Sequence, residues 1–151
     1  MTLEAKIVML AQSDPTLQSL FGTSPMRLFD RQLPQTYYAL GLCCSFRRIS
    51  EVRTYTQFGL MNLSQPRIQF DVWASPHYVN GAAEAARNAM NALVTWLGTV
   101  SFAENNDFDS PPTVPPHSPN YILNQRAAMD FQLEPPVYVE TIDARIFNLE
   151  N

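Results

Sequence analysis

The segment Arg67–Ala74, which stands directly before an alanine-rich stretch, constrains the fold more than any other part of the chain. Its apolar and polar side chains alternate strictly, which is typical of a β-strand with one buried face. We therefore expect a strand here, packed by its apolar face. That face holds Ile68, Phe70, Val72 and Ala74, and the polar face holds Arg67, Gln69, Asp71 and Trp73.

The residues after this strand predict a helix with one broad apolar stripe. Ser75-Pro76 is a start signal, a capping residue followed by proline. Gly81 weakens the first turns by about 1 kcal/mol relative to alanine, so the regular helix is expected to begin nearer Asn80. Gly98 is placed just past its end. The stripe consists of Ala82, Ala86, Ala89, Met90, Leu93, Val94 and Leu97.

The first 22 residues predict a helix, a break, and one or two further helical turns. Asp14-Pro15 is typical of a cap followed by proline at the first helical position, and Gly22 is placed to end the second helix. The apolar face of the first helix holds Leu3, Ile7, Leu10 and Ala11, and leaves out Glu4 and Lys6.

The remaining elements are predicted to be strands and loops. The order of helix, strands, helix, strands predicts a single α+β domain over 1–151, with two helices on a mostly antiparallel sheet. We expect strands over 26–29, 37–49, 121–133 and 137–147, a continuing strand or a long hairpin arm over 50–58, a loop over 59–66, and an extended proline-rich loop over 103–120.

Charge and cysteine usage narrow the class of protein. The formal net charge is −4 and Lys6 is the single lysine. This charge argues against a protein whose main function is to bind the phosphate backbone of nucleic acids. No stretch approaches the ~18 apolar residues of a membrane span, so we expect no membrane association. Cys43 and Cys44 are adjacent and point to opposite sides of a strand, so we expect reduced thiols and a cytoplasmic chain.

Catalytic and metal-binding motifs are sparse. His77 and His117 have no partner ligands at zinc spacing. Asn105, Asp107 and Asp109 resemble the start of a calcium loop, but the required glycine and glutamate are absent. Cys44 reads as core rather than as a nucleophile, since no histidine is placed to activate it. We expect no catalytic residues, no metal, no cofactor and no enzymatic activity.

Arginines and one tryptophan are the polar-face residues of interest. Arg47 and Arg48 face opposite sides of a strand and cannot form one patch, so each is expected to be solvated or to form a salt bridge with acidic residues of an adjacent subunit. Arg53 completes this basic cluster. Trp73 stands on the polar face of its strand, so it either lies under the helix that follows this strand or anchors a partner.

The layout resembles the tail-completion, or tail-to-head joining, proteins of long-tailed bacteriophages. The resemblance spans nearly the whole chain except 103–120, and its most specific element is Gln69-Phe-Asp-Val-Trp-Ala74 directly before a helix. It rests also on Leu-x-x-x-Ile-x-x-Leu over 3–10, Asp-Pro-x-Leu-x-x-Leu-Phe-Gly over 14–22, Leu33-Pro34, Tyr37-Tyr38, and the final Ile142-Asp-Ala-Arg-Ile-Phe147.

The resemblance implies a structural virion protein, a tail terminator that caps the tail tube as a homohexameric ring. Its implied partners are itself, the tail tube protein and the head–tail connector or stopper, with DNA passing through the lumen without specific binding. Its implied location is the head-proximal end of the tail, reached from the host cytoplasm during assembly. The alternatives are a neck or minor tail protein at another level, or a small ligand-binding or enzymatic α+β domain.

Interface residues are expected on the arm and on the loops. The arm and loop over 50–66 would meet the tube or a neighbour, and the 103–120 loop would reach a neighbour or the head side. The candidate interface residues are Arg47, Arg48, Arg53, Tyr55, Phe58, Met61, Trp73, Phe108 and Val114.

Overall fold

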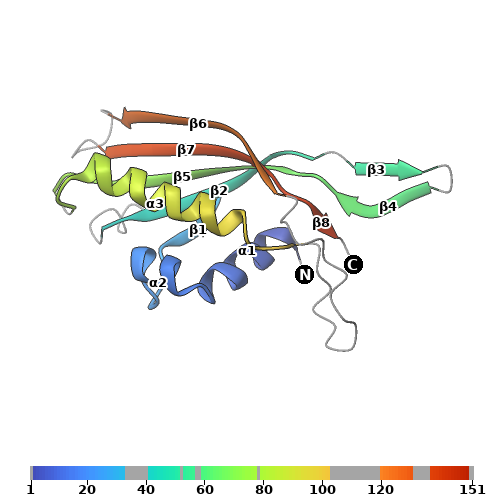
Figure 1. The fold of residues 1–151 in the computed structure, drawn as a ribbon, viewed down its shortest axis with the longest axis horizontal. Coiled ribbons are helices and arrows are strands. Elements are labelled where there is room, and N and C mark those ends of the chain that lie inside the picture. Colours follow the sequence, from blue (N-terminus) through green and yellow to red (C-terminus); the bar gives the residue numbers. More distant parts are fainter. Residues whose placement is uncertain are drawn as a thin grey trace.

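The structure, a computed structural model, is an α+β fold with helices on one side of a mostly antiparallel sheet (Figure 1). It describes residues 2–32, 41–51, 53–56, 59–77, 79–102, 120–130 and 137–149. The described elements are α1 (Leu3–Gln12), α2 (Pro15–Phe21), β1 (Leu28–Asp30), β2 (Cys43–Ser50), β3 (Arg53–Thr56), β4 (Gly59–Ser64), β5 (Arg67–Ala74), α3 (Ala82–Leu97), β6 (Tyr121–Asp130), β7 (Val137–Arg145) and β8 (Asn148–Leu149).

The main sheet has five strands in the order β1-β2-β5-β7-β6. Only the β1–β2 pair is parallel, and the other three pairs are antiparallel. The predicted strand over 67–74 is confirmed, and it lies at the centre of this sheet. The strands expected from residues 37 and 121 are present as β2 and β6, while 33–40 and 131–136 lie outside the described residues.

The hydrophobic core lies between the sheet and all three helices. The apolar face of β5 is fully buried, as its alternation predicted. The small side chains of Ala82, Ala86 and Ala89 let the first half of α3 approach the sheet closely, while Met90, Leu93 and Leu97 fill the core further along the helix. The core includes Leu3, Ile7, Leu17, Phe21, Phe46, Ile68, Phe70, Val72, Ala74, Ala86, Ala89, Met90, Leu93, Leu97, Ile142, Ala144 and Ile146.

Helix α2 is capped and ended as the sequence predicted. The Asp14 side chain accepts a hydrogen bond from the backbone N–H of Leu17, and Pro15 occupies the first turn of α2. Gly22 ends α2 with φ of 81°, a conformation that glycine adopts without a Cβ penalty. The break between α1 and α2 is therefore encoded by one capping carboxylate and one proline.

The prediction that Lys6 lies outside the buried face of α1 is wrong. It is buried, and its Nζ donates to the carbonyl oxygen of Phe102 at 3.4 Å and to Oδ1 of Asn148 at 3.0 Å. A buried ammonium is tolerated only where acceptors replace water. The only lysine of the chain thus ties α1 to β8 and to the segment after α3.

The start of α3 differs from the prediction. Ser75-Pro76 begins a turn rather than the helix, with the N–H of Val79 bonded to the carbonyl oxygen of Ser75 at 3.0 Å. Gly81 then adopts a left-handed conformation with φ of 61°, which separates that turn from the helix beginning at Ala82. The predicted end at Gly98 is confirmed.

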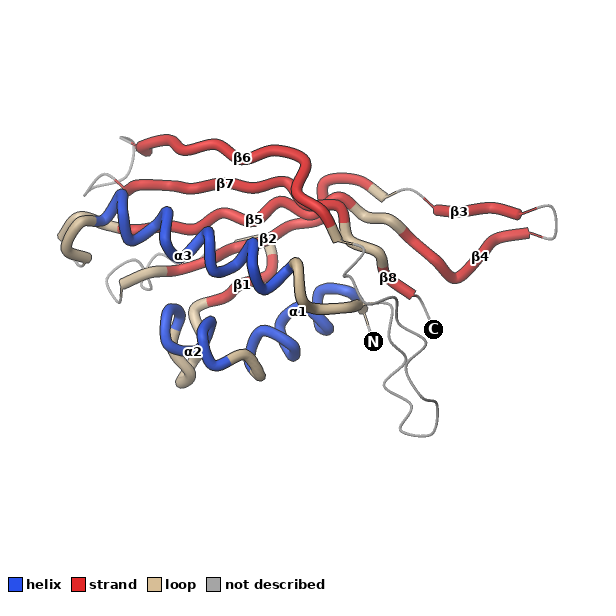
Figure 2. The backbone as a smooth tube through the Cα atoms, viewed as in Figure 1, coloured by secondary structure: helices blue, strands red, loops and turns tan. Residues whose placement is uncertain are grey.

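The prediction of a loop over 59–66 is wrong, because most of this segment is strand β4. Residues 53–64 form the hairpin arm that was one of two alternatives, with β3 and β4 antiparallel. Strand β8 pairs with β4, giving a second sheet in the order β3-β4-β8. The hairpin projects beyond the end of the main sheet (Figure 2). Local alternation was too weak here to distinguish a paired strand from a loop.

Candidate interaction surfaces

The face of the main sheet opposite the helices carries a continuous set of polar side chains. The strand register places Arg67 beside Arg145, Gln69 beside Asp143, and Asp71 beside Thr141 on this face. Their neighbours along each strand point into the core. We call this surface the helix-free face, and its described polar members are Ser45, Arg47, Arg67, Gln69, Asp71, Trp73, Tyr121, Asn124, Arg126, Thr141, Asp143 and Arg145.

Asp143 is the most buried charge on the helix-free face. Its side chain is 3% exposed, and Oδ2 accepts from Arg67 Nη2 at 2.6 Å and from Arg126 Nη1 at 3.4 Å. The two arginine side chains are 40% and 49% exposed. One carboxylate therefore anchors two cations whose far sides face solvent, and its Oδ1 has no hydrogen-bond partner among the described residues.

A second group of hydrogen bonds runs across β2, β5 and β7. Gln69 Nε2 donates to Asp71 Oδ1 at 3.0 Å, and the Thr141 hydroxyl donates to the same oxygen at 2.6 Å. Arg47 Nη2 donates to Oε1 of Gln69 at 3.3 Å. Each of these side chains is held by a neighbour on the next strand, so the face is rigid as well as polar.

Charge on the helix-free face is opposite in sign to that of the whole chain. Four of the chain's 10 basic residues lie there, Arg47, Arg67, Arg126 and Arg145, against two described acids, Asp71 and Asp143. Among the side chains that the structure describes, basic groups on this face therefore outnumber acidic ones, while the chain as a whole is net −4. Such a face attracts anionic groups of a partner.

Trp73 lies on the helix-free face and not under α3. Its indole Nε1 donates to the hydroxyl oxygen of Ser45 at 3.1 Å, and the ring is half-buried beside Cys43 on the neighbouring strand. The first of its two predicted alternatives is therefore wrong, because the alternation of β5 turns Trp73 away from the helices. The second alternative, an anchor for a partner, stays a prediction.

Arg47 and Arg48 point to opposite sides of the sheet, as expected for neighbours on a strand. Arg48 binds the carboxylate of Glu4 at 3.0 and 3.2 Å and that of Glu51 at 3.0 Å. These acidic partners belong to its own chain, so Arg48 fastens α1 to the sheet. A pairing of Arg48 with a neighbouring subunit would have to displace them.

The remaining candidate residues lie on the hairpin or beyond the described residues. Arg53 and Tyr55 are on β3, and Met61 is on β4. The structure gives the backbone path of these two strands, which places the three residues on the projecting arm. Phe58, Phe108 and Val114 lie outside the described residues, as does most of the proline-rich loop.

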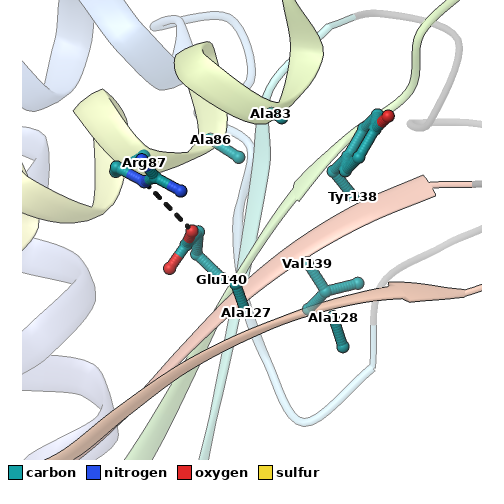
Figure 3. A pocket seen from close by; sticks show the side chains of 8 residues that line it. All are labelled: Ala83, Ala86, Arg87, Ala127, Ala128, Tyr138, Val139 and Glu140. Atoms are coloured by element: carbon teal, nitrogen blue, oxygen red, sulfur yellow. Dashed lines mark ion pairs between the residues drawn. The ribbon is translucent and has the colours of Figure 1, made fainter.

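A groove runs between α3 and strands β6 and β7, with a cavity of about 270 Å³. Its walls are mostly apolar and include Ala83 and Ala86 of α3 and Ala127 of β6. Glu140 points from β7 toward Arg87 on α3, with Oε1 at 3.8 Å from Nε (Figure 3). Arg87 is 66% exposed and Glu140 only 7%, so the carboxylate is the fixed, buried partner. No sequence pattern pointed to this groove.

The described thiols are suited to packing rather than to nucleophilic chemistry. Cys43 and Cys44 are free and buried. Burial raises the pKa of Cys43 to about 11, with nearby Arg27 opposing the shift, and burial raises the pKa of Cys44 well above its usual value. A thiol with a raised pKa is protonated at neutral pH and is a poor nucleophile.

The described parts of the chain hold neither a metal-binding cluster nor a membrane-spanning helix. No group of three or more histidine, cysteine, aspartate or glutamate side chains is placed to hold a metal ion within the described ranges. His77 is exposed in the turn after β5, and His117 lies outside those ranges. None of the described helices has the length and apolar character needed to cross a membrane.

Comparison with known proteins yields a structural similarity. No family model matches the sequence, and no curated protein matches it. The fold matches a chain in the solved structure of the virion of a native gene transfer agent (GTA) particle, with a TM-score of 0.58 and 15% sequence identity. The match covers 96% of this chain and 93% of that one. This fold occurs in a virion. At so low an identity the similarity establishes the fold alone.

Proposed function

We propose that this chain is a structural virion protein that caps the end of a phage tail tube as a ring and joins it to the head connector. The observation that carries the proposal is the match to a chain of a gene transfer agent virion over nearly the full length of both chains. The sequence resemblance to tail-completion proteins supports it independently, because it rests on residue patterns rather than on backbone shape.

The chemistry of the described surfaces supports an assembly role over catalysis. The helix-free face presents charged side chains that hold one another in place, and the hairpin extends away from the core. Such fixed polar surfaces and projecting strands suit contacts between subunits. The proposed partners are further copies of this chain in a hexameric ring, the tail tube protein, and the head–tail connector or stopper. DNA would pass through the lumen of the ring without specific binding. We propose that the chain has no enzymatic activity.

The test is to image mature particles and to add the purified chain to isolated tail tubes. A ring at the head-proximal end of the tube, directly below the portal, is the expected result. Density at another level of the tail would instead support a neck or minor tail protein. Absence of the chain from particles, or turnover of a metabolite by the purified protein, would overturn a structural role.

A further inference from the structure

Strand β6 is the outermost strand at one edge of the main sheet. It spans ten residues, Tyr121–Asp130, and pairs with β7 along one side only among the described strands. Side chains on both of its faces are exposed over 123–128. Of the three exposed large hydrophobic residues in the described chain, Tyr121 and Leu123 are on this strand, at 43% and 41% exposure.

Strand β6 lacks most of the features that protect natural edges. Edges are commonly made safe by short strands, by prolines or by free charges. This strand is long and contains no proline, and its described cation, Arg126, is bound to Asp143. It does contain a register shift between Ile122 and Asn124, which lies near one end and leaves the pairing regular from Asn124 to Asp130. The opposite edge is β1, which is only three residues long. An exposed edge of this length is suited to pairing with a strand from another chain.

The hairpin offers a second open edge on the same molecule. Strand β3 is the outer strand of the β3-β4-β8 sheet, and it projects away from the body (Figure 1). Two different open edges on one chain favour a head-to-tail contact, in which the edge of one copy meets the other edge of the next. A head-to-tail contact that closes on itself produces a ring.

We propose that strand β3 of a second copy pairs with the open edge of β6, with side chains of the added strand entering the groove beside Glu140. Strand β3 carries one cation, Arg53, and one aromatic residue, Tyr55. The small residues Ala127 and Ala86 leave room for an aromatic ring, and the buried Glu140 carboxylate complements a cation.

Arg87 now supplies that cation weakly. Its Nε lies 3.8 Å from Glu140 Oε1, and its side chain is mostly exposed. Arg87 can therefore turn outward into solvent at little cost and release Glu140 to another cation. The proposal deepens the ring proposed above by naming the contact that closes it. Its test reads self-association alone, so the result does not depend on where the ring sits in a virion.

The test is site-specific crosslinking between two singly substituted chains. A chain carrying Ala127→Cys is mixed with one carrying Tyr55→Cys and treated with a short bismaleimide. A covalent dimer is expected in the mixture and in neither chain alone. The wild-type chain controls for Cys43 and Cys44, whose thiols are buried. Asn88→Cys replaces Ala127→Cys as the matched control, because Asn88 is exposed on α3 and does not line the groove.

A second measurement separates docking from folding. Ala127→Glu places a second carboxylate beside Glu140 on an exposed position, so it should weaken self-association at least about tenfold while leaving the circular dichroism spectrum unchanged. Asn88→Glu adds the same charge elsewhere and should not weaken it. Crosslinking of Ala127→Cys with itself would instead indicate a two-fold β6–β6 pairing. That result, or no crosslink in concentrated mixtures, would overturn the proposal.

Discussion

Arg67 on β5 donates from Nη2 to Oδ2 of Asp143 on β7 across 2.6 Å, and the acceptor is almost wholly buried. Arg126 on β6 reaches the same oxygen from the other side. Three strands of the sheet are thus joined through a single carboxylate on the face that no described helix covers.

Removing that carboxylate should destabilise the fold. Asp143→Ala leaves two arginines facing each other without their counter-charge, and we expect the free energy of unfolding to fall by about 2 kcal/mol, discounted for the partial exposure of the arginines. Urea unfolding measures the loss. Arg31→Ala is the control, since its pairing with Asp30 is at the surface and should be worth less than about 0.5 kcal/mol. Equal losses in the two variants would contradict this account.

Lys6 should contribute to stability through its hydrogen bonds. Lys6→Met keeps the apolar stem but leaves the Phe102 carbonyl and the Asn148 amide oxygen without their donor, at a cost of about 2 kcal/mol. Thermal unfolding of the two proteins would show it. Replacement of the exposed Gln12 on the same helix by Met supplies the comparison, and there the melting temperature should barely move.

The close contact of α3 with the sheet should tolerate no added bulk. Ala89 is fully buried, so Ala89→Leu forces side chains or backbone to shift and should cost about 1–3 kcal/mol. The half-buried Ala92 of the same helix accepts leucine more readily. Denaturant midpoints of the two variants should therefore differ clearly, and similar midpoints would show that the interface is loosely packed.

The buried thiols predict a loss of stability in alkaline solution. The pKa of Cys43 is raised from 9.0 to about 11 in the folded chain, so above pH 9 the unfolded state ionises while the folded state does not. Stability from this group is complete below pH 9 and is lost as pH rises toward 11, by up to about 3 kcal/mol. Unfolding measured at several pH values should show a steeper decline in the wild type than in a Cys43→Ala, Cys44→Ala variant.

The proline-rich segment should act in assembly and not in folding. Deletion of 105–118 is expected to leave a folded monomer with an unchanged melting temperature, yet to weaken joining of tails and heads. Sedimentation and electron microscopy of assembly mixtures would measure this. Normal joining of tails by the deleted protein would remove the idea.

Strong local signals made the central parts of the fold predictable. The alternation of 67–74, the Asp14-Pro15 cap and the spacing of apolar residues in 82–97 each report a physical requirement of one element. Trp96 could also have been found, because it stands three residues after Leu93, and it packs edge-on against Phe102 with ring centroids 6.0 Å apart.

Features that depend on distant partners could not be predicted. Lys6 looks like a solvent-facing residue until Asn148 and Phe102 are brought to it. Strand β4 has little alternation of its own and depends on pairing with β3 and β8. Glu140 alternates with core residues, and only the approach of α3 makes its position a groove.

The arginine-rich face has a consequence at the scale of an assembly. In a closed cyclic array every copy has the same orientation about the axis, so any electrical asymmetry of one copy is repeated around the circumference. A subunit with its positive arginines on one side of a sheet, in a chain of opposite overall sign, would give such an annulus a continuous cationic band. A polyanion approaching such a ring would be attracted to one side more than to the other, because the electrostatic potential extends beyond the range of direct contact.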